Sequence, residues 1–120
     1  MTSLDELVKM DGVVFACEFS PEGKCLGYKA NMGVSPEMAD KAAQYMATVT
    51  MMFDTLAGAF SQESKMNWTP QMGWGYSGGD WNVMVSGNRA LWVEMSKADL
   101  NALWEQLAPE EAMARLSQGM

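Results

Sequence analysis

The chain has 120 residues, the size of one domain, and enough of them are hydrophobic to form a core without disulfides or metals. Fifteen acidic and eight basic residues give a net charge of −7, which argues against nucleic acid as a partner. The absence of histidine removes the Ser-His-Asp and Cys-His nucleophile systems and the usual zinc and iron ligand sets. We therefore expect no catalytic residue, no metal and no cofactor.

No apolar run approaches the roughly 18 residues that a membrane-spanning helix needs. Residues 1–10 are polar and mixed in charge, whereas a signal peptide has a basic start and then an apolar stretch. A basic amphipathic helix is also missing, which disfavours an anionic membrane surface. With no repeat or linker, the sequence predicts one cytoplasmic domain over residues 1–120 that does not insert into a membrane.

The first element expected is a short helix over residues 2–10. Ser3 is its predicted N-cap, and Glu6 follows three residues later, which is the spacing of a capping box. Gly12 stands where a C-cap glycine belongs.

A β-hairpin follows the first helix. Residues 13–19 and 24–30 are rich in strand-forming residues. The sequence SPEG over 20–23 predicts the turn between them, with proline second and Gly23 last.

A long helix is predicted from the cap Ser35, with Pro36 at its first position, to about Ser64. Its apolar residues recur at helical spacing in one stripe: Met38, Ala42, Tyr45, Val49, Met52 and Leu56. A second row lies beside that stripe: Ala39, Ala43, Met46, Phe53 and Phe60. A helix with so wide an apolar surface is expected to pack under a second layer or against another subunit.

Three strands are predicted next, over 71–77, 80–86 and 89–95. The dipeptides Gly78-Gly79 and Gly87-Asn88 between them are favoured two-residue hairpin loops. These loops predict the following cross-strand pairs: Tyr76 with Trp81, Trp74 with Val83, Met72 with Val85, Val83 with Trp92, and Val85 with Ala90. The meander is apolar on both faces, so we expect both faces to be covered.

The last predicted helix has Ser96 as its N-cap and Asp99 at its third position. A polar tail over 108–120 follows, with the composition of a short helix. The expected order is helix, two strands, long helix, three strands and helix. It predicts an α+β, three-layer domain with a five-stranded antiparallel sheet and helices on both faces, with its core over about 3–107.

The glycine-rich stretch 73–83 raises the question of phosphate binding. A phosphate loop lies between a strand and a helix, whereas these glycines lie between two strands, and Asp80 would repel an anion. The stretch therefore indicates a hairpin. Gly73 and Gly75 alternate with large side chains, so another backbone or helix can approach their strand closely.

The stretches GVVFACEFSPEGKCLGYKANMGVSPEMA and SGGDWNVMVSGNRALWVEMSKADLNALW resemble the two halves of the roadblock/dynein light chain domain. The resemblance covers about residues 3–107. It is closest to small prokaryotic roadblock-like proteins of unknown function, in which NWTP, GW and SGGD recur together. The chain departs from the family pattern in having thirteen methionines and five tryptophans.

The resemblance implies a roadblock/profilin-like fold and a non-catalytic, homodimeric platform for other proteins. Such proteins pair through the long helix and the neighbouring edge strand, and prokaryotic members often regulate small Ras-like GTPases or act as scaffolds. The candidate dimer interface is then Met38, Ala42, Tyr45, Met46, Val49, Met52, Phe53, Leu56, Phe60, Gly73 and Gly75.

Two other functions stay open at this point. The first is a small-molecule sensor of profilin or PAS-like shape that holds a ligand against the tryptophan-rich sheet, in a cavity of about 300 Å³ or more. The second is a redox or sulfur-carrier protein that depends on Cys17 and Cys25. In a simple four-residue turn Cys25 faces Glu18, so the two sulfurs are expected on opposite faces and as free thiols.

Overall fold

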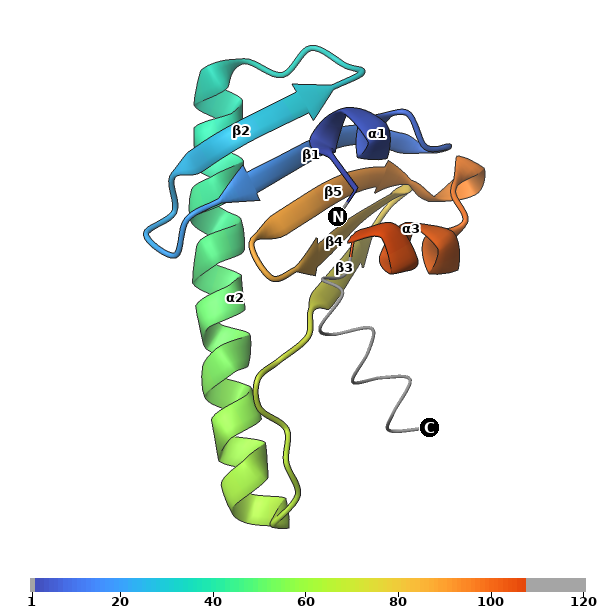
Figure 1. Cartoon of the computed structure of the whole chain (residues 1–120). Coiled ribbons are helices and arrows are strands. Elements are labelled where there is room, and N and C mark those ends of the chain that lie inside the picture. Colours follow the sequence, from blue (N-terminus) through green and yellow to red (C-terminus); the bar gives the residue numbers. More distant parts are fainter. Residues whose placement is uncertain (1, 108–120) are drawn as a thin grey trace.

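The computed structural model describes residues 2–107, and the predicted tail over 108–120 lies outside the described residues (Figure 1). The elements follow the predicted order. They are α1 (Leu4–Val8), β1 (Val13–Phe19), β2 (Cys25–Ala30), α2 (Pro36–Ser64), β3 (Trp74–Gly78), β4 (Trp81–Ser86), β5 (Arg89–Glu94), the 3₁₀ turn η1 (Met95–Lys97) and α3 (Leu100–Leu107).

The five strands form one antiparallel sheet in the order β2-β1-β5-β4-β3. Helix α2 lies on one face of the sheet, and α1 and α3 lie on the other, as Figure 1 shows. The predicted three-layer α+β architecture is therefore confirmed. The strands β2 and β3 form the two edges of the sheet.

The capping box of α1 is present as predicted. The Ser3 hydroxyl accepts a hydrogen bond from the Glu6 amide, and the Glu6 carboxylate accepts one from the Ser3 amide. Gly12 has a positive φ of 86°, but the helix has already ended at Val8, so Gly12 is not its C-cap as expected. A Cβ on Gly12 would lie 2.7 Å from the Cβ of Ala98, and the position therefore serves close packing.

The first hairpin turns at Gly23, whose φ is 88°. Its register differs from the prediction, because a bulge between Glu18 and Phe19 pairs Cys25 with Phe19. The bulge brings Cys25 to the same face as Cys17, and both side chains pack in the core beside α2. The prediction of opposite faces is therefore wrong. Both cysteines are free in this structure.

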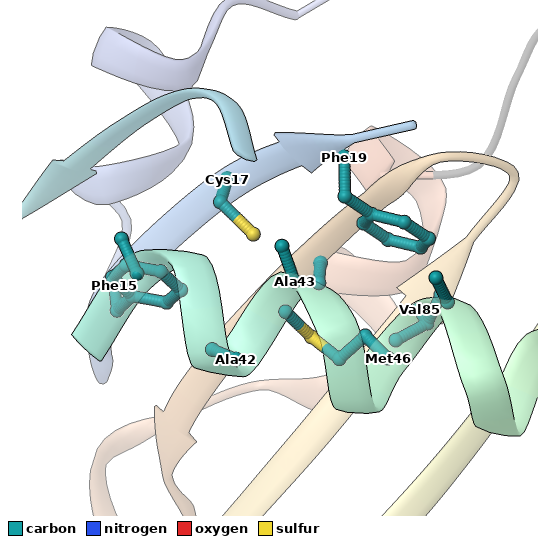
Figure 2. Packing of buried hydrophobic residues seen from close by; sticks show 10 residues of the cluster. Phe15, Cys17, Phe19, Ala42, Ala43, Met46 and Val85 are labelled. Atoms are coloured by element: carbon teal, nitrogen blue, oxygen red, sulfur yellow. The ribbon is translucent and has the colours of Figure 1, made fainter. Parts of the chain in front are cut away.

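The core between α2 and the sheet joins large side chains of β1 to small ones of the helix. In Figure 2, Phe15, Cys17 and Phe19 lie on β1 opposite Ala42, Ala43 and Met46 of α2. Ala39 and Ala47 belong to the same buried set. Small residues let the helix approach the sheet closely, so the face of α2 that meets the sheet is its alanine-rich face.

The second core lies between the sheet and the helices α1 and α3. The buried residues on this side are Leu7, Val8, Val13, Ala16, Met84, Leu91, Val93, Leu103 and Leu107. These include Met84, Leu91 and Val93 of the meander, which are therefore covered as expected.

The hairpin between β3 and β4 is shifted from its predicted register. Gly78 pairs with Trp81, so the loop is Gly79-Asp80 and not Gly78-Gly79, and β3 begins at Trp74 and not at residue 71. Trp74 therefore faces Val85, and Tyr76 faces Val83. The shift is by two positions, which leaves every side chain on its predicted face. The Asp80 carbonyl accepts a hydrogen bond from the amide of Met95, 3.0 Å away.

The hairpin between β4 and β5 has the predicted loop Gly87-Asn88 and the predicted pairs. Gly79 and Gly87 have φ values of 60° and 59°, as their loop positions require. Asn88 has no positive φ, so the glycine alone provides the left-handed conformation of that loop.

Helix α3 begins later than predicted. Ser96 lies in the turn η1, and the Asp99 carboxylate instead caps the helix by accepting a hydrogen bond from the Ala102 amide at 3.2 Å. Both residues are good N-caps. Local capping preference therefore does not decide between them.

Candidate interaction surface

Helix α2 crosses the sheet over β1 and β2 and leaves the α2-side face of β3 and β4 partly open. Apart from Ala42, which is buried in the core, the predicted apolar stripe of α2 is exposed or half-buried and is not covered by the sheet. Tyr45 and Met52 are 69% and 66% exposed, and Met38 and Leu56 are also exposed. We expected both faces of the meander to be covered. On the face toward α2, this cover is incomplete.

A hollow runs between the exposed stripe and the open part of the sheet. It has a volume of about 520 Å³ and almost no polar lining. We call it the aromatic groove. Its walls are Tyr45, Val49 and Phe53 from α2, and Trp74, Tyr76, Val83 and Trp92 from the strands.

The rings and hydrogen bonds around the groove fix its shape. Trp74 packs on Phe53 with the ring centroids 5.8 Å apart, and its indole N–H donates to the Thr50 hydroxyl at 2.9 Å. Trp92 packs on Phe15 of the core, with the ring centroids 4.6 Å apart. These contacts therefore orient Trp74 and Trp92 in the lining of the groove.

The predicted interface residues fall into three groups. Exposed or half-buried on α2 are Met38, Tyr45, Val49, Met52, Phe53, Leu56 and Phe60. Ala42 and Met46 line the groove but are buried in the core of their own subunit. Gly75 lines the groove from β3, whereas Gly73 precedes β3 and packs against Trp104.

Apart from Gly75, the strand residues of the groove were not among the predicted interface residues. Trp74, Tyr76, Val83 and Trp92 were nevertheless assigned to one face by the hairpin registers. That common face was the signal that could have found them. It was missed because the meander was expected to be covered on both sides.

The edge strand β3 adjoins the groove. Its outer edge pairs with no strand among residues 2–107. Natural edge strands are usually protected by charges or proline, yet β3 has the uncharged sequence WGYSG. The other edge, β2, carries Lys29, which forms an ion pair with Asp5 at 3.5 Å. The unprotected edge is therefore the one beside the apolar groove.

The C-terminal half of α2 projects past the sheet, and the segment 65–73 returns alongside it (Figure 1). We call α2 residues 50–64 together with this segment the arm. Trp68 anchors the segment: its ring packs on Phe60 with centroids 5.4 Å apart, and its amide and indole N–H groups donate to the hydroxyls of Ser61 and Ser64. The arm is thus an ordered structure with a helix on one side and an extended chain on the other.

The two thiols are poorly suited to redox or carrier chemistry. Burial, with smaller contributions from Cys25 and Glu18, raises the pKa of Cys17 from 9.0 to about 12. Burial also raises the pKa of Cys25. The thiolate is the reactive form, so both shifts oppose the cysteine-dependent alternative.

A buried charge lies at the first residue of β5. Arg89 is 3% exposed, and its Nη2 donates to the carbonyl of Thr2. Its Nε lies 3.8 Å from Glu18, and neither Nε nor Nη1 has a hydrogen-bond partner among the described residues. Burial lowers the pKa of Arg89, although Glu18 opposes that shift. The residue ties the N-terminus to the first hairpin, away from the aromatic groove.

Residues 2–107 contain no group of three or more Cys, Asp or Glu side chains that could hold a metal ion. Within the same residues, no helix is both long and apolar enough to span a bilayer.

A family model described as "Uncharacterized conserved protein (DUF2173)" matches residues 3–109. The chain belongs to the DUF2173 family. Among curated proteins, no match to this DUF2173 chain is found.

Solved structures show which fold this DUF2173 member has. A Roadblock/LC7 domain from Streptomyces avermitilis is 15% identical, with a TM-score of 0.72 over 86% of this chain and 83% of that one. The gliding protein MglB from Thermus thermophilus is 17% identical, with a TM-score of 0.70 over 98% and 87% of the two chains. An MglB described with a tetrameric arrangement is 17% identical, with a TM-score of 0.70 over 97% and 85%. The chain therefore has the roadblock fold that the sequence resemblance implied.

Proposed function

We propose that this DUF2173 protein is a non-catalytic platform that pairs with a second copy of itself and binds another protein, a small Ras-like GTPase. The observation that carries the proposal is the aromatic groove beside the unprotected edge strand β3. An apolar surface of this kind on a small domain marks an interaction site.

The energetics favour pairing over exposure. Transferring a side chain such as Tyr45 or Met52 from water to an apolar interface stabilises a complex by about 1.5–3 kcal/mol. Pairing of the β3 edges would at the same time satisfy backbone groups that water now solvates. A stable interface buries about 1,000 Å² or more, so the proposed pairing has to use the stripe and the edge strand as well as the groove.

The first variants test the pairing with a second copy. Tyr45→Glu combined with Met52→Glu places two charges in the apolar stripe without touching the subunit's core. We expect sedimentation to give the mass of two chains for the wild type at micromolar concentration and of one chain for the variant. Charge burial at such an interface costs far more than the lost apolar contact.

Met51→Glu is the matched control, because Met51 is 60% exposed on the same helix but lies off the stripe. It should leave the dimer intact. A wild-type protein that sediments as one chain would overturn the pairing.

The GTPase partner is supported by the roadblock fold and by the sequence resemblance. The tagged protein, isolated gently from its own host, should carry a stoichiometric protein partner, identified by mass spectrometry. Guanine nucleotide released from the complex and measured by chromatography would identify that partner as a GTPase. A partner without guanine nucleotide would be consistent with a platform for other proteins but would contradict a GTPase as that partner.

A small-molecule sensor is the second candidate, because the groove volume of about 520 Å³ exceeds the size that a ligand requires. The groove is the same surface in both proposals, so one occupant excludes the other. Native mass spectrometry of the purified protein decides between them. A dimer mass without added ligand supports the platform, whereas a single chain carrying a small molecule supports the sensor.

A further inference from the structure

An apolar cleft runs along the arm, between the second half of α2 and the returning segment 65–73. Its volume is about 540 Å³, and most of its lining is apolar. We call it the arm cleft. Its main walls are Phe53, Leu56, Ala57 and Phe60 from α2, and Trp68, Pro70 and Met72 from the segment.

The arm cleft is open although large apolar side chains form its walls. Leu56, Phe60 and Trp68 are all exposed. In the second half of α2, Ala57 is the one residue that the described part of the chain buries. So apolar and exposed a helix face on a small domain marks a surface that another group covers.

The last described element ends beside this cleft. Helix α3 ends at Leu107. One turn earlier, the Trp104 ring packs so tightly against Gly73 that it leaves no room for a Cβ there. Gly73 in turn belongs to the lining of the arm cleft. Residues 108–120 therefore begin next to the cleft.

The sequence over 108–120 has the pattern of a short amphipathic helix. Pro109 suits the first helical position, and Glu110 and Glu111 suit the first turn. The apolar residues after them recur at spacings of three and four, which place them on one face: Ala112, Met113, Leu116 and Met120. A helix of about 11 residues is not stable by itself in water, so such a helix forms only if its apolar face packs on something.

The lengths of the two partners agree. Residues 50–64 of α2 rise by about 22 Å, and a helix over 109–119 would be about 16 Å long. Packed helices lie about 8–10 Å apart. A helix of this size fits along the arm, with its apolar face toward the cleft.

We propose that residues 108–120 of the chain cover the arm cleft, with Met113 and Leu116 packed between α2 and Trp68. The open apolar cleft, the end of α3 beside it and the matching apolar pattern of the tail carry this inference together.

This inference does not rest on the proposed function, but it divides the candidate dimer interface. Leu56 and Phe60 are then covered within their own subunit. The stripe from Met38 to Met52 and the edge of β3 remain available to a second copy.

The test is NMR of the full-length protein, with the Trp68 ring as the reporter. We expect nuclear Overhauser contacts from the ring protons of Trp68 to the methyl groups of Met113 and Leu116. These contacts should not depend on protein concentration, because they form within one chain. Contacts that appear only as the concentration rises would show that the tail of a second copy covers the cleft, and would overturn the inference.

Two pairs of substitutions in the tail sharpen the test. Met113→Ser combined with Leu116→Ser removes the centre of the apolar face, so the contacts should vanish and the Trp68 indole N–H signal should shift. Arg115→Ser combined with Gln118→Ser is the matched control, since these residues lie on the opposite face of the same predicted helix. The control should keep both the contacts and the signal of the wild type.

Three further results would overturn the inference. They are the absence of the contacts in the wild type, contacts of Leu116 with Tyr76 or Trp92 of the aromatic groove instead, and a Trp68 signal that is the same in the wild type and in the Met113→Ser, Leu116→Ser variant. Sedimentation of the same samples separates this inference from the proposed pairing. A dimer without contacts between the tail and Trp68 contradicts only the covered cleft, whereas a single chain that has them contradicts only the pairing.

Discussion

Among single residues, Gly73 is packed so closely that a substitution there has a clear predicted effect on stability. A Cβ at this position would lie 2.2 Å from Cη2 of Trp104 and 2.5 Å from the carbonyl oxygen of Val85. The Trp104 ring can shift, but the carbonyl belongs to the β4 backbone. We expect Gly73→Ala to lower the free energy of unfolding by about 1–3 kcal/mol, measured by chemical denaturation.

Gly75→Ala is the control for this substitution. The nearest atom to its added Cβ is the carbonyl oxygen of Val83 at 3.5 Å, an ordinary contact distance. The change should stay within about 1 kcal/mol. Equal losses from the two variants would contradict the close approach of Trp104.

The Cys17 thiol predicts a loss of stability in alkali. Because its pKa is raised to about 12 in the folded state, the thiol stays protonated there while the unfolded chain ionises above about pH 9. Unfolding then releases a proton, so stability is fully present below pH 9 and falls between pH 9 and 12. The loss is at most about 1.4 kcal/mol per pH unit.

The contribution of Cys17 to the pH dependence of stability can be isolated with Cys17→Ala. This variant is expected to be less stable at every pH because it loses buried volume. Urea denaturation at about pH 8 and about pH 10.5 should show a smaller alkaline loss in Cys17→Ala than in the wild type. The same loss in both proteins would mean that Cys17 is not the group responsible.

At the scale of elements, α2 is a helix whose two halves are stabilised differently. Its first half packs alanines against the sheet, whereas Ala57 is the only buried residue after Ala47 among the residues of α2. The second half therefore depends more on helix propensity and on the anchored segment 65–73.

Gly58 tests this account of the arm. It lies inside α2, and an added Cβ would meet no atom within 4 Å. A glycine inside a helix is less favourable than alanine by about 0.5–1 kcal/mol. Gly58→Ala should therefore raise the free energy of unfolding by that amount in denaturant titrations. A loss of stability would show that the arm is not helical at this point in solution or that another molecule packs there.

At the scale of the whole molecule, the proposed pairing predicts that thermal stability depends on protein concentration. Mass action stabilises a folded dimer as concentration rises. The midpoint of thermal unfolding should rise with concentration in the wild type and stay constant in the Tyr45→Glu, Met52→Glu variant. A constant midpoint in both proteins would contradict pairing through the stripe.

The sequence by itself determined the number and order of the α-helices and strands between residues 2 and 107, but not the 3₁₀ turn η1. The capping box at Ser3, the start of α2 at Ser35 and the loop at Gly87 are set by local chemistry: a side chain next to a free amide, or a backbone that needs positive φ. The face on which each strand residue lies follows from the period of two. The faces are as predicted in β3, whose register shifted by two positions, but the bulge at Glu18 places Cys25 on the face opposite to the predicted one.

Tertiary contacts decided what these local rules leave open. Helical period shows that α2 has an apolar stripe and an alanine-rich face, but only the close approach of the sheet selects the face that is buried. The bulge at Glu18 and the Gly79-Asp80 loop likewise involve neighbours distant in sequence, because the Phe19 amide donates to the Asn88 carbonyl and the Met95 amide donates to the Asp80 carbonyl.

The candidate site also has one part that the sequence predicts and one part that only the folded chain reveals. The exposed stripe of α2 could be predicted because it repeats along one element. The small pocket lined by Thr50, Asp54 and Gln71 could not, because these residues meet only when the chain folds back along the arm. Periodicity records which residues share a face of one element, whereas a pocket built from two segments depends on where the second segment returns.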